Sequence, residues 1–90
     1  MPMSNNGLTK LIEECGELSQ IAAKKIAYIH TDDHPDGSGS MKTRLEEEAA
    51  DVIAAIAFVC KTLSLDEAAI FERAQKKKER FEKWHADPNS

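Results

Sequence analysis

The sequence predicts an all-α fold, an antiparallel bundle of about three helices, and three observations lead to this prediction. The 90 residues are enough for one domain. The chain is rich in Ala, Glu, Lys and Leu, which favour helices, and it lacks the alternation of apolar and polar residues that is typical of strands. Apolar residues instead recur every three or four positions along three segments. Residues 1–90 are therefore expected to form a single helical domain, with 1–7 and 86–90 frayed.

The first predicted helix begins at Leu8, after a polar lead-in in which Ser4, Asn5 or Asn6 is the candidate N-cap. Its apolar residues keep helical spacing for about six turns, as far as Ile29. The segment 30–40, HTDDHPDGSGS, then breaks the pattern with one proline and two glycines. This segment is predicted to be a loop.

A second helix is predicted to follow Ser40, its candidate N-cap, and to continue to Leu63. The sequence SLDE at 64–67 has the form of a capping box, in which the serine is the N-cap and the glutamate reaches back to it. The third helix is therefore expected to run from about residue 65 to about residue 84 or 85.

Composition and charge exclude several classes of function. The formal net charge is −4, which argues against a protein that binds a nucleic-acid polymer. The chain has no signal peptide and no long apolar segment, so a cytoplasmic protein without a membrane partner is expected. Cys15 and Cys60 lie on apolar helix faces without zinc-motif spacing, and both are expected to be reduced core thiols.

One acidic pattern occurs twice, 34 residues apart, as EECGE at 13–17 and EEAAD at 47–51. On helical wheels, Glu14 and Glu48 fall within the apolar stripes of the first and second helices. The acidic residue three positions further on falls at the edge of each stripe, on the same face. The two leading glutamates, Glu13 and Glu47, lie further round on the polar faces.

Antiparallel packing of these two stripes would bring four carboxylates together: Glu14, Glu17, Glu48 and Asp51. Carboxylates at such short range repel one another unless a cation neutralises them. Mg²⁺ suits this set because it prefers oxygen ligands and retains waters that can bridge to a phosphate, and Mn²⁺ is expected to substitute for it. The sequence therefore predicts a divalent metal site between the first two helices.

The acidic elements, their order and their helical context resemble those of the MazG-type, all-α nucleoside triphosphate pyrophosphohydrolases, in particular short, phage-like members. The resemblance runs from about residue 8 to about residue 84. It implies Mg²⁺-dependent hydrolysis of an NTP or dNTP to the monophosphate and pyrophosphate. The resemblance also implies six catalytic residues. Four of them hold Mg²⁺: Glu14, Glu17, Glu48 and Asp51. The other two, Glu13 and Glu47, assist the ligands or orient the attacking water.

Members of this family also carry basic residues on the following helix, in an arrangement close to K-x-x-x-N-x-x-R. The corresponding residues here are Arg73, Lys77 and Arg80, which share a helix face. The resemblance implies that they contact the phosphates of the substrate. Lys77 stands where many members have asparagine, so a role in reading the base or sugar is not carried over to it.

Self-association is expected for two reasons. Long helices in a chain of only 90 residues bury a modest core, so their apolar faces are expected to need a second subunit. The family resemblance implies a homodimer or homotetramer, because family sites are commonly completed across a dimer.

Two alternatives stay open. Phosphoribosyl-ATP pyrophosphohydrolase is a related enzyme with similar acidic helices. A non-catalytic helical interaction or regulatory module would use its acidic pairs only for salt bridges between helices. The enzyme is favoured because no basic residue occupies the opposing stripe positions. Lys24, Lys25 and Lys42 are not placed in both stripes to neutralise the acids.

Overall fold

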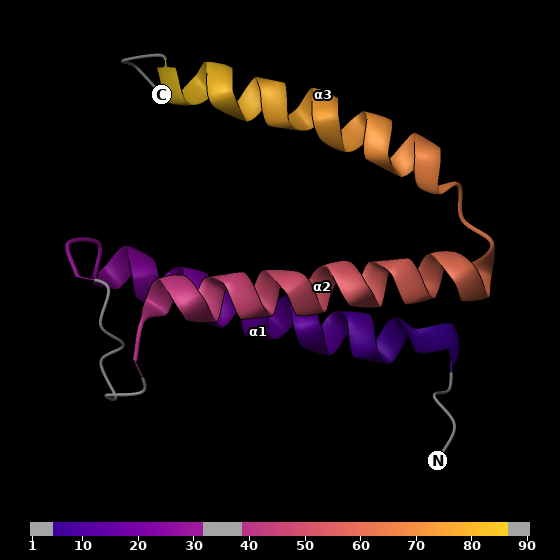
Figure 1. Cartoon of the computed structure of the whole chain (residues 1–90), viewed down its shortest axis with the longest axis horizontal. Helices are drawn as coiled ribbons and strands as arrows, with labels where there is room; N and C mark the ends of the chain where they lie inside the picture. Colours follow the sequence, from indigo (N-terminus) through magenta and orange to yellow (C-terminus); the bar gives the residue numbers. More distant parts are fainter. Residues whose placement is uncertain (1–4, 32–38, 87–90) are drawn as a thin grey trace.

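The computed structural model describes residues 5–31 and 39–86 of the chain, and these residues are helical apart from short connections (Figure 1). A 3-10 turn (Asn5–Gly7) leads into α1 (Leu8–Ala27), which is followed by α2 (Met41–Leu63) and α3 (Glu67–Ala86). The prediction of an all-α chain is confirmed. Most of the predicted loop at 30–40, and most of the predicted frayed ends, lie outside the described residues.

The N-cap of α1 is Gly7 and not one of the three predicted residues, although the Asn5 side chain bonds to the first turn of the helix. The Asn5 side-chain oxygen accepts the backbone N–H of Thr9 at 3.0 Å, and its amide donates to the Thr9 hydroxyl at 2.7 Å. Gly7 occupies the N-cap position itself with a φ of 87°, a left-handed conformation that favours glycine. The helix ends at Ala27, two residues before the predicted end, where the Tyr28 N–H bonds to the Lys24 carbonyl.

Ser40 is the N-cap of α2, as predicted, because its hydroxyl accepts the backbone N–H of Thr43 at 3.1 Å. The predicted capping box at 64–67 is wrong. Ser64 closes α2 instead, with a φ of 55° and its N–H bonded to the Cys60 carbonyl. The cap of α3 is Asp66, whose carboxylate accepts the Ala69 N–H at 3.0 Å. A serine in the left-handed conformation cannot have the extended backbone of an N-cap.

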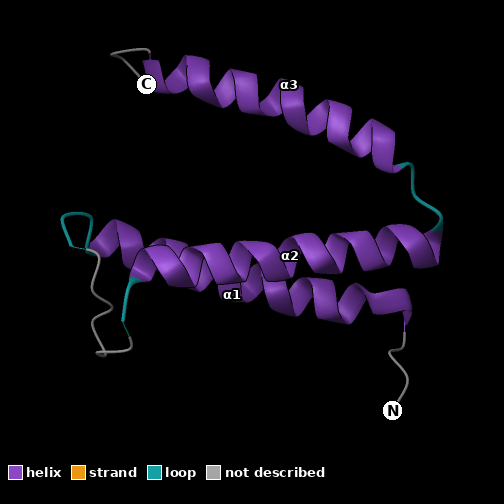
Figure 2. Ribbon diagram, viewed as in Figure 1, coloured by secondary structure: helices purple, strands orange, loops and turns teal. Residues whose placement is uncertain are grey.

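Helices α1 and α2 run antiparallel and side by side, and the core lies between them (Figure 2). The buried apolar side chains are Ile21, Met41, Ala55, Val59 and Cys60. The Thr62 hydroxyl donates to the Asn6 carbonyl at 2.7 Å and ties the end of α2 to the start of α1. Cys15, which was expected in the core, is exposed, because only one neighbouring helix covers α1.

Helix α3 leaves the end of α2 and turns back along it without joining the core (Figure 1). It has no buried residue, and its large apolar side chains, including Phe71 and Trp84, are exposed. The radius of gyration is 15.9 Å, whereas a compact 90-residue domain has about 12 Å. The closed bundle of three helices is therefore not formed within one chain. No described helix is long and apolar enough to cross a bilayer.

Candidate metal centre

The four acidic residues predicted to form a metal site come together between α1 and α2. Glu14 and Glu17 project from α1, and Glu48 and Asp51 project from α2. One carboxylate oxygen from each lies within 4.8 Å of those of the other three. The four carboxylates converge because the two acidic residues of each helix are three positions apart, and so share a face, and because the two helices pack antiparallel. A cluster of this kind could hold a metal ion.

Burial divides the four residues into two inner and two outer ones. Glu14 and Glu48 are each only 7% exposed, whereas Glu17 and Asp51 lie at the solvent edge. This division matches the predicted positions within and beside the apolar stripes. Ionised carboxylates are costly to bury without a cation or hydrogen-bond donors. A nearby positive charge therefore stabilises the two inner carboxylates more than the two outer ones.

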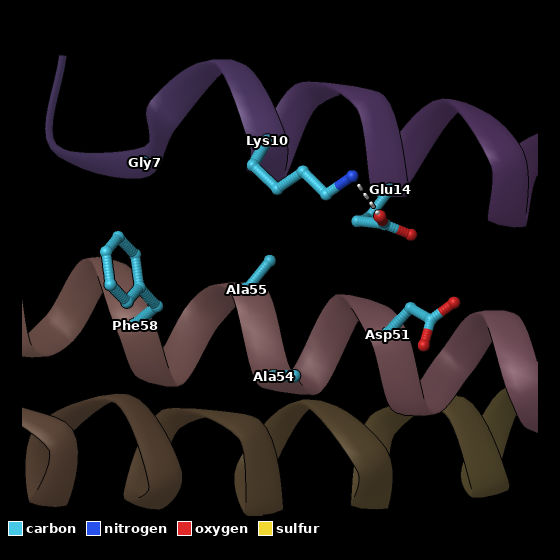
Figure 3. A pocket seen from close by; sticks show the side chains of 7 residues that line it. All are labelled: Gly7, Lys10, Glu14, Asp51, Ala54, Ala55 and Phe58. Carbon is cyan, nitrogen blue, oxygen red and sulfur yellow. Dashed lines mark ion pairs between the residues drawn. The ribbon is translucent and has the colours of Figure 1, made fainter. Parts of the chain in front are cut away.

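Each inner glutamate has one basic partner on its own helix. Lys10 Nζ lies 3.3 Å from Glu14 Oε1, as Figure 3 shows, and Arg44 Nη2 lies 3.4 Å from Glu48 Oε1. Lys10 also pairs with Glu13 at 3.3 Å. Hydrogen bonds to Glu14 and then to Glu13 raise the pKa of the Lys10 ammonium. Both inner glutamates were expected to lack a basic partner. This expectation is wrong for one oxygen of each, because Lys10 pairs with Glu14 Oε1 and Arg44 pairs with Glu48 Oε1.

The second oxygen of each inner carboxylate has no such partner. Glu14 Oε2 and Glu48 Oε2 are both buried, and neither has a hydrogen-bond partner among the described residues. An unsatisfied buried acceptor costs about 1–3 kcal/mol, and more when it is charged. A cation held by the cluster would supply the positive charge that such oxygens lack, so these residues fit a hard divalent ion that prefers carboxylate ligands.

The neighbouring glutamates of the cluster raise the pKa of Glu17. A hydrogen bond to the Glu48 carboxylate raises the pKa of Glu17, and the negative charge of Glu14 raises it further. A carboxyl group donates this bond only when it is protonated. Protonated Glu17 thus gives Glu48 a donor that ionised Glu17 cannot give. A bound metal cation would reverse the balance and favour the ionised form.

A hollow of about 390 Å³ opens beside the cluster (Figure 3). Glu14 and Asp51 lie at one end, and Lys10 lines the hollow from α1. Its apolar part is formed by Ala54, Ala55 and Phe58 of α2. The volume lies within the usual range of small-molecule sites, roughly 300–1,000 Å³. The hollow therefore joins part of the acidic cluster to an apolar surface.

Glu17 and Glu48 of the cluster do not line this hollow, and neither do the other residues predicted for the site. Glu13 and Glu47 are exposed, and Glu13 is engaged with Lys10. The basic residues of α3 are also exposed, and none of them lines the hollow within one chain: Arg73, Lys77 and Arg80. The Lys77 ammonium lies 5.9 Å from the centre of the Phe81 ring on its own helix.

Sequence reasoning missed three contributors to the site: Lys10, Arg44 and Phe58. A signal for the first two was present, because each basic residue precedes an inner glutamate by four positions on the same helix face. Phe58 carried no comparable signal, since an aromatic residue in an apolar helix is usually a core residue.

Comparison with protein-family models, with curated proteins and with solved structures found no match to this chain.

Proposed function

We propose that this protein is a Mg²⁺-dependent nucleoside triphosphate pyrophosphohydrolase that converts an NTP or dNTP to the monophosphate and pyrophosphate. The observation that carries the proposal is the meeting of four carboxylates within 4.8 Å, two of which leave a buried oxygen without a partner. The acidic elements at 13–17 and 47–51, which resemble those of the MazG-type enzymes, support the choice of reaction.

In this proposal Glu14, Glu17, Glu48 and Asp51 hold the metal. Mg²⁺ bound there would neutralise the triphosphate and stabilise the charge that develops at the α-phosphorus. The two inner glutamates are held in place by burial and by Lys10 and Arg44, so the ligand set is preorganised. The exposed Glu13 and Glu47 would orient the attacking water or accept its proton.

The hollow supports a nucleotide-sized substrate. Lys10 lines it and would donate to a phosphate oxygen, while Phe58 offers an apolar surface to the nucleoside. We propose that Arg73, Lys77 and Arg80 also contact the phosphates. Because they do not line the hollow within one chain, this contact requires α3 of a second copy or a different placement of α3.

The test is a panel of NTPs and dNTPs assayed for pyrophosphate release with Mg²⁺. Glu48→Gln is expected to abolish release while helix content is unchanged, because the substitution removes a metal ligand but keeps the shape of the side chain. The matched control is Glu46→Gln, since Glu46 is an exposed glutamate of α2 outside the cluster. If the Glu48→Gln variant releases pyrophosphate as fast as the unmodified protein, the assignment of the site is contradicted. If the unmodified protein releases no pyrophosphate from any nucleotide, the proposed activity is contradicted.

A second candidate is a non-catalytic helical interaction module, and the pairing of Lys10 with Glu14 and of Arg44 with Glu48 favours it. The thermal stability of the protein separates the two candidates. Mg²⁺ with a non-hydrolysable dNTP is expected to raise the melting temperature of the enzyme, because ligands that bind only the folded state stabilise it. An unchanged melting temperature would support the interaction module.

A further inference from the structure

Another hollow opens between α1 and α2, at the other end of the acidic cluster. It has a volume of about 250 Å³ and is lined by four residues of α1 and one of α2: Glu17, Gln20, Ile21, Lys24 and Arg44. Four of these five side chains are polar or charged, so this cavity is called the polar hollow, and the one that contains Phe58 is called the apolar hollow. The polar hollow is smaller than the usual site for a whole small molecule, roughly 300–1,000 Å³, so it suits one end of a larger ligand.

The two hollows lie at opposite ends of the cluster along the helix pair. On α1, the lining of the apolar hollow ends at Glu14, whereas the lining of the polar hollow begins at Glu17. On α2 the order is reversed, because Arg44 of the polar hollow precedes Glu48 and the residues of the apolar hollow follow it. The antiparallel packing of the two helices makes these two orders agree in space (Figure 2). An elongated ligand that crosses the cluster can therefore reach both hollows.

The two hollows also occupy equivalent positions in the two acidic helices. A shift of 34 residues aligns the acidic elements at 13–17 and 47–51. The same shift aligns every residue of the polar hollow with a residue of the apolar hollow: Arg44 with Lys10, Glu17 with Asp51, Gln20 with Ala54, Ile21 with Ala55, and Lys24 with Phe58. The helix pair thus has an approximate internal twofold symmetry, in which each helix presents the same positions to the other.

The chemistry of the walls breaks this symmetry. Where the apolar hollow has Ala54 and Phe58, the polar hollow has Gln20 and Lys24. Amide and ammonium groups donate hydrogen bonds to anionic oxygens, whereas methyl and phenyl groups do not. The polar hollow is lined by two basic side chains, Lys24 and Arg44, and the apolar hollow by one. An anionic end and an apolar end of one ligand would therefore be directed to different hollows.

Arg44 lies where the polar hollow meets the cluster. Its Nη2 donates to Glu48 Oε1 at 3.4 Å. A guanidinium group has five N–H donors in a planar fork that matches phosphate oxygens, so Arg44 can hold Glu48 and donate to a phosphate at the same time. The carboxylate of Glu17 also lines this hollow and would repel an anion. A divalent cation at the cluster would offset this repulsion, so anion binding is expected to require the metal.

We propose that the polar hollow binds the β- and γ-phosphates of the substrate, which leave as pyrophosphate, and that the apolar hollow binds the nucleoside. This inference rests on the proposed function, because it gives the direction in which the triphosphate crosses the cluster. The α-phosphate then lies at the cluster, between Lys10 and Arg44. Water bonds to the α-phosphorus and gives its proton to a nearby carboxylate. The oxygen that bridged the α- and β-phosphates leaves with the bonding electron pair as part of pyrophosphate.

The experiment is a calorimetric titration of inorganic pyrophosphate into the whole protein, with Mg²⁺ in millimolar excess. The unmodified protein is expected to bind pyrophosphate. Lys24→Met is expected to weaken this binding by about tenfold, because a charged donor to the phosphate oxygens is lost. The matched control is Lys25→Met, which removes the same charge one residue further along α1 but lines neither hollow, and its affinity is expected to be unchanged.

A second titration, with a non-hydrolysable dNTP, compares the two hollows at equivalent positions. Phe58→Ala is expected to weaken binding of the dNTP by roughly fivefold or more, because stacking on the base is lost, and to leave the affinity for pyrophosphate unchanged. Lys24→Met is expected to weaken binding of both ligands. Circular dichroism of each variant checks that its helix content is unchanged.

Three results would overturn the assignment of the polar hollow. They are an absence of pyrophosphate binding by the unmodified protein, an affinity for pyrophosphate in Lys24→Met equal to that of the unmodified protein, and equal losses in Lys24→Met and Lys25→Met. Release of pyrophosphate from nucleotides is measured separately and tests the proposed function. Release by the unmodified protein, together with unchanged pyrophosphate affinity in Lys24→Met, would retain the function and reject the polar hollow. The predicted pattern of affinities in a protein that hydrolyses no nucleotide would retain the hollow as a pyrophosphate site and reject the function.

Discussion

At the residue scale, the site depends on two buried glutamates whose charges are only partly compensated. Lys10 and Arg44 each serve one oxygen of an inner carboxylate, and the other oxygen of each has no partner among the described residues. The carboxylates of Glu14 and Glu48 were predicted from the sequence to converge, because residues three apart share a helix face and both lie within apolar stripes. The basic partners were missed because neutralising charges were sought on the facing helix.

Removal of Arg44 tests the role of these basic partners. Arg44→Met is expected to destabilise the metal-free protein by about 1 kcal/mol, because it leaves the buried Glu48 uncompensated and the arginine is itself partly exposed. Saturating Mg²⁺ is expected to reduce this loss. Urea denaturation with a chelator and with Mg²⁺ measures both values. Lys76→Met, which removes a cation from a fully exposed pair, is the control and is expected to cost less under both conditions.

The raised pKa of Glu17 predicts a dependence of stability on pH. The folded state holds the proton of Glu17 more tightly than the unfolded state, in which the pKa is about 4.3. The contribution of this group is therefore fully present below that pH and is lost as the pH rises through the folded-state pKa. Free energies of unfolding measured without metal are expected to decrease as the pH rises from below about 4.3 through the folded-state pKa of Glu17. Glu17→Gln is expected to remove it, and an unaltered pH profile would contradict the assignment.

At the element scale, periodicity predicted the helices but not all of their ends. The start of α2 follows the expected pattern of a polar cap before an apolar stripe, whereas Gly7 is the N-cap of α1. The connection from α2 to α3 also departs from the prediction, because Ser64 takes a left-handed conformation and Asp66 takes the capping role. Both residues are common at caps and turns, so composition alone does not decide between them.

The roles of Ser64 and Asp66 can be distinguished by substitution. Ser64→Gly is expected to stabilise the protein by up to about 1 kcal/mol, because glycine adopts a positive φ without steric cost. Asp66→Ala is expected to destabilise it by about 1 kcal/mol through loss of the bond to the Ala69 N–H. Thermal unfolding followed by circular dichroism measures both changes. Destabilisation by Ser64→Gly without a loss of stability in Asp66→Ala would instead support the predicted capping box.

At the scale of the whole molecule, the described residues form a helix pair with a third helix that lies apart from the core. Periodicity identified the apolar face of α3, but it could not say what covers that face, because a stripe has the same spacing whether its partner is the same chain or another one. The same limit explains why Cys15 and Ile12 lie on an apolar stripe and yet are exposed.

The acidic cluster and the apolar groove between α2 and α3, whose lining includes Ile53 and Phe71, lie on two different faces of α2. One face closes on α1 around the four carboxylates, and the other is open toward α3. The basic residues of α3 can reach the hollow only if the arrangement of several chains, or of α3 itself, brings them there. The proposed function depends first on the cluster, since without a bound metal the carboxylates would repel a triphosphate.

Metal binding by the cluster is therefore the most direct test of the central claim, and Mn²⁺ titration followed by electron spin resonance measures it. The unmodified protein is expected to bind Mn²⁺ at the cluster, and Mg²⁺ is expected to compete. Glu48→Gln is expected to weaken binding by at least about tenfold, because a coordinating carboxylate and the second oxygen without a partner are both lost. Equal Mn²⁺ affinity in the unmodified protein and in Glu48→Gln would contradict the account.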